Sequence, residues 1–268
     1  MDVTQLAHCL DTHLRTETFP LGVMTSSDAG RIPAKAKLPR RDLGVPLALC
    51  QGVSIARKYG WTVAFTGDEI SCPVARVTFG FAEALDYYTE GNLAAGMYSA
   101  TCEAGARFEK ALSTFTPGER AVVVVGPLSR IDFDPDSVLV YGNPAQILRL
   151  VNAALYQDGG ALASEFSGRA DCTDLIIKPD RTGQPQVVLP CYGDRVFAMT
   201  ADHEMAFTFP FALADKIAAG LEGTARGGIR YPIPQFLRFE ALFPPSYQEL
   251  ERQWQEQLDE KTEPPATP

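Results

Sequence analysis

Apolar residues recur with two different periods along this chain. In the first part the helical period dominates. Leu6, Leu10 and Leu14, for example, recur every fourth residue and would form one apolar face of a helix. Runs rich in β-branched residues alternate with such segments, and we expect them to form strands. The helices are predicted over residues 3–15, 46–59, 92–113 and 144–157, and the strands over 19–25, 61–66, 120–125 and 137–141.

Beyond Gly160 the period changes from helical to alternating. Short apolar segments follow one another about ten residues apart, a spacing typical of an antiparallel sheet with tight turns. Helices are expected again from Pro210 and from Ser246, where Ser246 and Glu249 form a capping-box pattern. The pattern therefore predicts an α+β fold with helix–strand units first and an antiparallel, strand-rich second half. The strands expected in that half are residues 162–166, 175–177, 186–189, 196–199 and 205–209.

The chain shows neither a repeat of fixed period nor a clear linker. We therefore expect one domain over residues 1–260 and a disordered tail over residues 261–268. Residues 26–45 are rich in Pro, Gly, Ser and basic side chains, which predicts a long loop. Loops of that length in a compact domain are usually functional or mobile.

Composition and charge indicate a globular protein with an acidic surface. The 268 residues are 46% apolar and 21% charged, and the formal net charge is −9. Such a charge repels phosphate backbones, so we expect no nucleic-acid partner. The N-terminal residues include Asp2, Asp11 and Arg15, so they lack the apolar core of a signal peptide, and no apolar run is long enough to cross a bilayer. We therefore expect a cytoplasmic protein without membrane contact, whose thiols stay reduced.

Cysteines carry most of the candidate chemistry. Cys72 precedes Pro73 at the expected start of a short helix, where the helix dipole favours a thiolate. Cys191 belongs to residues 189–195, the densest run of chemically able side chains in the chain. The six cysteines are Cys9, Cys50, Cys72, Cys102, Cys172 and Cys191.

Several stretches together resemble the family known as domain of unknown function 169 (DUF169). They include Asp68-Glu69 before Ser71-Cys72-Pro73, then Pro135-Asp136-Ser137, Asn143-Pro144-Ala145-Gln146, Leu189-Pro190-Cys191 with Gly193-Asp194-Arg195, and Asp202-His203-Glu204-Met205. The resemblance covers roughly residues 15–250, with the motifs in the family's order. By resemblance, Cys50, Cys72, Cys172 and Cys191 fall within the family's motifs, whereas Cys9 and Cys102 lie outside them. The family carries no established activity that could be transferred.

The four motif cysteines allow three interpretations. As thiolates brought together from distant stretches, Cys50, Cys72, Cys172 and Cys191 could ligate an iron–sulfur cluster or a metal ion, with redox or lyase-type chemistry on a small-molecule substrate. The chain contains no CxxC motif, the strongest sequence signature of such a site. The same cysteines could instead be buried structural residues of a cofactor-free small-molecule-binding or regulatory protein. A single catalytic thiol is the third interpretation.

Asp194 and Arg195 are the candidate catalytic residues beside Cys191. The planar guanidinium of Arg195 could clamp a substrate carboxylate or phosphate, or could lower the pKa of the Cys191 thiol. Alternatively, Asp194 and Arg195 form a structural salt bridge that closes a β-turn. His203 and Glu204 could supply a base. The chain contains no GxGxxG, P-loop or GxSxG motif, so nucleotide binding and serine hydrolysis lack support.

Overall fold

The computed structural model describes residues 1–233 and 241–262, with side chains up to residue 258. The chain divides into two compact units, Met1–Tyr231 and Pro232–Pro268. The smaller unit contains α10 (Pro245–Thr262). Whether both units belong to one domain, as we expect from the sequence, stays a prediction. The expected tail at 261–268 falls for the most part outside the described residues.

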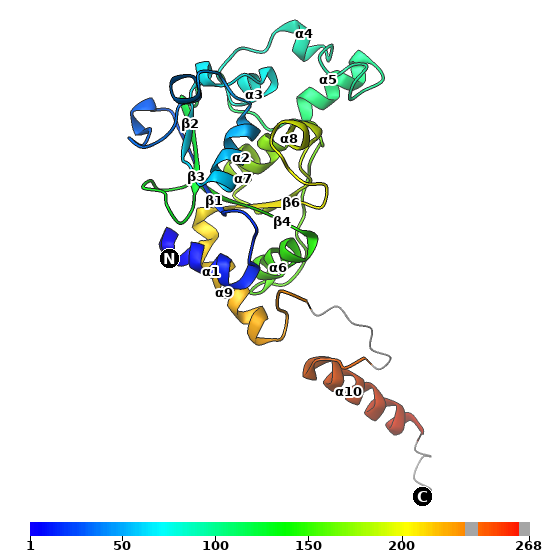
Figure 1. Cartoon of the computed structure of the whole chain (residues 1–268). Coiled ribbons are helices and arrows are strands. Elements are labelled where there is room, and N and C mark those ends of the chain that lie inside the picture. Colours follow the sequence, from blue (N-terminus) through cyan, green and yellow to red (C-terminus); the bar gives the residue numbers. More distant parts are fainter. Residues whose placement is uncertain (234–240, 263–268) are drawn as a thin grey trace, which may run out of the picture. The chain divides into compact units, whose positions relative to one another are not determined.

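In the described part of the larger unit, six strands form one sheet in the order β2-β3-β1-β4-β6-β5 (Figure 1). Each neighbouring pair is antiparallel, and Val23 of the central β1 lies opposite Val125 of β3 and Ser137 of β4. The α+β fold predicted from the sequence is therefore confirmed. The strands are β1 (Leu21–Ser26), β2 (Val63–Phe65), β3 (Val122–Pro127), β4 (Ser137–Gly142), β5 (Gln186–Val188) and β6 (Met205–Pro210).

Helices cover both faces of the sheet (Figure 1). Along β4, Val138 and Val140 point to one face and Leu139 and Tyr141 to the other, because successive side chains of a strand alternate. The first face packs against α1 (Val3–Leu14), α6 (Pro144–Leu155) and α9 (Ala214–Arg226). The second face packs against α2 (Leu49–Tyr59), α3 (Pro73–Thr78) and η4 (Thr173–Ile177). Helix α7 (Lys178–Thr182) contacts β6, and α8 (Tyr192–Phe197) packs against α2.

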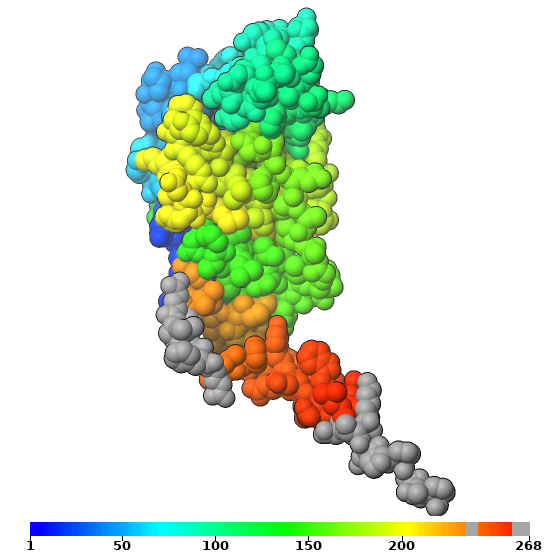
Figure 2. Space-filling model, turned by 90° about the vertical axis from the view of Figure 1, so that its right-hand side faces the viewer, coloured from blue at the N-terminus to red at the C-terminus, as the bar shows by residue number. Residues whose placement is uncertain are grey.

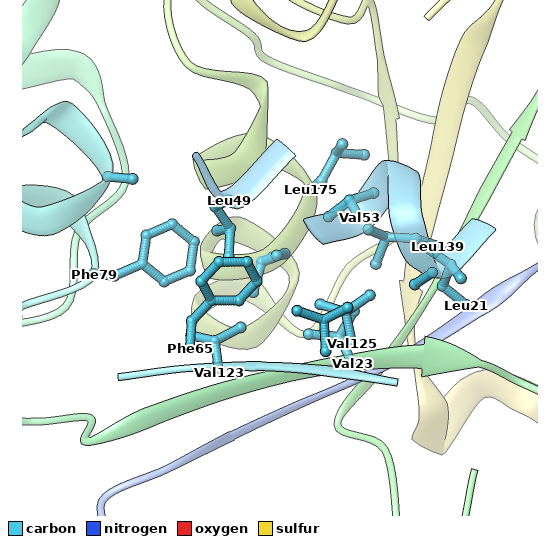
Figure 3. Packing of buried hydrophobic residues seen from close by; sticks show 14 of the residues in the cluster. Leu21, Val23, Leu49, Val53, Phe65, Phe79, Val123, Val125, Leu139 and Leu175 are labelled. Atoms are coloured by element: carbon cyan, nitrogen blue, oxygen red, sulfur yellow. The ribbon is translucent and has the colours of Figure 1, made fainter. Parts of the chain in front are cut away.

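Helix α2 lies unusually close to the second face, and this places its N-terminal turn. Leu49 and Val53 face Phe65, Val123 and Val125 across the apolar core (Figure 3). Gly52 permits this approach, since a Cβ atom there would lie 2.3 Å from the ring of Phe65. The helix ends at Gly60, whose positive φ of 76° closes the last turn.

The second half contains fewer strands than the sequence predicts. Residues 186–189 and 205–209 are confirmed as β5 and β6, but residues 162–166 have no regular secondary structure. Residues 175–177 belong to the π-helical turn η4, and residues 196–199 overlap α8, so these three predicted strands are wrong. Leu175, Ile176 and Ile177 are buried on all sides, and such a short apolar run does not distinguish a strand from a buried helix.

The remaining elements are short. The expected helix over 92–113 is restricted to α5 (Cys102–Ala111), which follows α4 (Asp86–Thr89). The long loop at 26–45 contains two helical turns, η1 (Ala29–Arg31) and η2 (Pro39–Leu43). Two further turns are η3 (Gly67–Glu69) and η5 (Phe211–Leu213).

Candidate functional site

A cavity of about 490 Å³ lies at the second face of the sheet, and its wall contains Cys50, Cys72, Cys172 and Cys191 together. The fold thus brings the four motif cysteines to one place, although they come from four separate stretches of the chain. Cys9 and Cys102 are not part of this wall. Cys9 packs in the apolar core of the opposite face, and Cys102 is exposed at the start of α5.

All four cavity cysteines lie at the beginnings of helical segments. Cys50 is the second residue of α2, and Cys72 is the N-cap residue of α3. Cys172 and Cys191 are the N-cap residues of η4 and α8. Pro73 occupies the first position of α3, where its missing N–H leaves no hydrogen bond unmade. Pro73, next to Cys72, therefore serves the local structure at the start of α3.

Burial keeps most of these thiols in the protonated form. Burial, followed by the neighbouring Asp171 carboxyl, raises the pKa of Cys191 to about 12. Burial, followed by the nearby carboxyls of Asp194 and Asp171 respectively, also raises the pKa values of Cys50 and Cys172 well above the usual range. The expectation that Arg195 lowers the pKa of Cys191 is therefore wrong. Neutral thiols of this kind ionise when a positively charged metal binds them.

Two buried carboxyl groups, those of Asp171 and Asp194, lie next to the cavity cysteines. Asp171 lines the cavity and is 3% exposed; burial raises its pKa, while hydrogen bonds with Cys191 and Asp194 act in the opposite direction. Burial and then the neighbouring Asp171 raise the pKa of Asp194 to about 8. Asp194 Oδ2 also accepts a hydrogen bond of 2.7 Å from Thr200 Oγ1. Two adjacent carboxyls in a buried place cannot both ionise easily, so the pair holds a proton between them.

Arg195 lies outside the cavity wall and braces the following turn. Its Nη1 donates to the carbonyl oxygen of Ala201 at 2.6 Å, and its Nη2 donates to the carbonyl oxygen of Glu204 at 3.4 Å. Asp194 and Arg195 are not paired with each other among the described ion pairs, so a salt bridge between them is not found there. A catalytic role for Asp194 or Arg195 stays a prediction.

A buried ion pair that the sequence did not reveal fastens α2 to residues 191–204. Arg57 is 1% exposed. Its Nη1 and Nη2 donate to the two carboxylate oxygens of Glu204 at 2.5 and 3.1 Å. Its Nη2 also donates to Thr200 Oγ1 at 3.0 Å, and the guanidinium lies 4.3 Å from the ring centroid of Tyr141. Because Thr200 in turn bonds Asp194, this network connects the centre of α2 with the carboxyls behind the cavity.

Arg169 is a second residue of the site that sequence reasoning missed. It lines the cavity, stacks 4.4 Å from the ring centroid of Tyr98 and donates through Nη2 to Glu109 Oε1 at 2.9 Å. Tyr98 also lines the cavity, together with the apolar side chains of Met97 and Phe197, and these residues come from two segments that lie side by side at the surface (teal and yellow in Figure 2). Arg169 and Asp171 flank Ala170 directly before the motif cysteine Cys172, and this position is the one signal that could have indicated them.

The side chains as placed do not form a site for a single metal ion. In residues 1–233 and 241–258, no group of three or more His, Cys, Asp or Glu side chains could hold one ion. A tetrahedral zinc site with metal–sulfur bonds of about 2.3 Å needs sulfur atoms about 3.8 Å apart. The four cysteines line a cavity of about 490 Å³ instead.

The fold and the site define an α+β protein whose single antiparallel sheet, within the described residues, carries a thiol-lined cavity on one face. The chain belongs to the family DUF169, described as "Uncharacterised ArCR", whose model matches residues 9–220. The resemblance stated from the motifs is therefore confirmed, and the matched range contains all four cavity cysteines. Part of the chain is also similar to the uncharacterised protein MJ0308 of Methanocaldococcus jannaschii, with 38% identity over 88 residues. That match covers 32% of this chain and 38% of the relative.

No solved structure matches the chain. Within the part of the chain that the structure describes, no helix combines the length and the apolar character needed to cross a membrane.

Proposed function

We propose that the cavity holds an iron–sulfur cluster bound by Cys50, Cys72, Cys172 and Cys191. We further propose that the protein performs redox or lyase-type chemistry on a small molecule in the same cavity. One observation carries the proposal: four cysteines from distant stretches line one cavity.

The donor set fits a cluster better than a single ion. Four thiolates are the usual ligands of such a cluster. In a cluster each iron atom is bound by a different cysteine, so four thiols around one cavity can hold it without converging on a single point. Bound by all four cysteines, a cluster would supply one-electron transfer, whereas lyase-type chemistry would need one iron without a cysteine ligand to act as a Lewis acid.

Residues in and around the cavity would hold the proposed cluster in place and shield it from water. The ion pair between Arg57 and Glu204 fixes the wall that contains Cys50 against the segment that contains Cys191. Apolar side chains such as Leu49 and Val74 line the cavity and reduce its access to water. Asp171, hydrogen-bonded to Cys191, presents a carboxyl group to the same space.

Anaerobic purification followed by iron and sulfide analysis tests the proposal. We expect iron and sulfide in near-equal amounts and an absorbance band near roughly 400 nm. Serine at any one of Cys50, Cys72, Cys172 or Cys191 should remove most of the iron, because an alkoxide ligand replaces thiolate poorly. The matched controls are Cys9→Ser, in the opposite core, and Cys102→Ser, on the surface; both should retain it. A chain without iron after anaerobic reconstitution, or cavity variants with unchanged iron, would contradict the proposal.

A cofactor-free small-molecule-binding protein is the second candidate. The observation that favours it is the raised pKa of the cavity thiols, because protonated thiols pack as small apolar groups. In that case the cavity thiols should react slowly with a thiol reagent, and a chelator should leave the rate unchanged. Cys102, which is exposed, serves as the fast-reacting reference. A rate that increases after chelation would instead support the cluster.

A further inference from the structure

Two buried polar atoms in the cavity wall lack hydrogen-bond partners. The described residues contain eight such side-chain atoms, and two of them, Arg169 Nε and Asp171 Oδ2, belong to residues that line the cavity. The Arg169 side chain is 8% exposed, and Asp171 is 3% exposed. Unpaired buried polar groups are rare in folded proteins, and two in one cavity indicate a ligand that pairs with them.

The chemistry of the two atoms differs. Arg169 Nε can only donate, and it belongs to a guanidinium that prefers an anionic oxygen such as that of a carboxylate. Glu109 holds this guanidinium through Nη2 and leaves Nε available. Asp171 Oδ2 calls for a group that can donate or accept, and a hydroxyl does both. A ligand that pairs with both atoms therefore carries an anionic oxygen and a hydroxyl group.

The charge and the apolar surface of the cavity wall restrict the class of ligand further. Among the described residues that line the cavity, Arg169 is the one cation, and Glu109 already balances part of its charge. A monoanion fits this balance better than a phosphate dianion, which usually requires more than one cationic group. Leu49, Val74 and Phe197 line much of the remaining wall and favour an apolar body.

We propose that the cavity binds a small hydroxycarboxylic acid with an apolar body, with its carboxylate on Arg169 and its hydroxyl on Asp171. This inference deepens the proposed function, because it names the substrate class of the same cavity. It places the hydroxyl-bearing end of the ligand beside the four thiols, since Asp171 and Cys191 are neighbours in the cavity wall. The carboxylate end lies toward Tyr98, on which Arg169 is stacked.

Three related ligands test the inference on the unaltered, anaerobically purified full chain. Calorimetry would compare 3-phenyllactate with 3-phenylpropionate, which lacks the hydroxyl, and with 3-phenyllactamide, which lacks the negative charge. We expect 3-phenyllactate to bind about tenfold or more tightly than either analogue, because 3-phenylpropionate loses the hydrogen bond to Asp171 and the amide replaces a charge-assisted hydrogen bond to Arg169 by a weaker, neutral one. This comparison requires no variant, so it does not depend on the folding of one. Equal binding of all three ligands, or no binding of 3-phenyllactate, would overturn the inference.

Variants then assign the two contacts. Arg169→Gln should abolish the preference for 3-phenyllactate over its amide, and Asp171→Ala should abolish the preference over 3-phenylpropionate. Arg107→Gln, the same change at an exposed position of α5, should leave both preferences intact. Iron and sulfide content is measured on the same samples. Iron-bearing protein without ligand preference refutes this inference alone, whereas iron-free protein with the preference refutes the cluster alone.

Discussion

Replacement of Arg57 by methionine tests whether one buried ion pair holds the two walls of the cavity together. Methionine keeps the apolar stem of the side chain but removes the guanidinium. Glu204 then keeps a single hydrogen bond, of 2.7 Å from the amide N–H of Ala201, and loses both contacts to Arg57. Breaking a buried pair by removing one partner destabilises a protein by about 3–5 kcal/mol, because the remaining charge stays buried.

That magnitude is large for a single side chain. Domains are stable by about 5–15 kcal/mol, so the variant would lose a substantial part of the total. For a domain of this size, each kcal/mol lowers the midpoint of thermal unfolding by about 2–4 °C, so a decrease of roughly 6–20 °C is expected. Urea denaturation followed by circular dichroism would measure the free energy of unfolding directly.

A matched control and a double variant make the test specific. Arg226→Met removes an exposed arginine that lies 3.8 Å from Glu222 on α9, and it should cost less than about 1 kcal/mol. The double variant Arg57→Met/Glu204→Gln removes both charges, so it should be more stable than the sum of the two single changes by about 1–3 kcal/mol. If Arg57→Met is no more destabilising than the control, the ion pair does not hold the cavity walls together.

Two further predictions concern helix packing and pH. A Cβ atom at Gly220 of α9 would lie 2.1 Å from the carbonyl oxygen of Ala153 in α6, so Gly220→Ala should destabilise by about 1–3 kcal/mol in urea denaturation. Gly227→Ala, where the nearest atom would be 3.5 Å away, should change stability little, and equal losses would contradict the close packing. Burial acts to raise the pKa of Glu204, but hydrogen bonds from Arg57 and the Ala201 N–H outweigh it and hold that pKa below its usual value. Its stabilising contribution is therefore present above about pH 4.3 and is lost as the pH falls through the lower folded-state pKa. Unfolding free energies measured from pH 7 to pH 3 should fall more steeply for the wild type than for Glu204→Gln, and parallel curves would refute this.

The helices that the sequence predicts well are the long, strictly periodic ones. Residues 3–15 and 144–157 correspond closely to α1 and α6, because their apolar stripes face a single sheet and their N-termini carry capping side chains. The valine run of β3 is buried on both faces, as its continuous apolar character indicates. In these elements local preference and tertiary packing agree.

For the candidate site, in contrast, the sequence does not show which residues come together in the fold. The motif resemblance identified Cys50, Cys72, Cys172 and Cys191, but no spacing along the chain could show that they line one cavity. Arg57 and Glu204 are 147 positions apart, so their pairing leaves no local trace. A charged residue in a helix is usually exposed, and only the fold shows that Arg57 is buried.

The two faces of the sheet differ in how the segments that cover them are held in place. On the first face, α1, α6 and α9 have 12, 12 and 13 residues and pack through a continuous apolar core. On the second face, α2 packs over a core of similar extent, but the segment around Cys191 is a six-residue helix followed by a turn. Side chains replace part of what regular structure would supply there, since Arg57 holds Glu204 and Thr200 while Arg195 holds the carbonyl groups of Ala201 and Glu204. An arginine that binds a backbone turn in this way can position the wall of a cavity without being part of it. This explains why Arg195, although close to Cys191 in the sequence, lies outside the cavity wall.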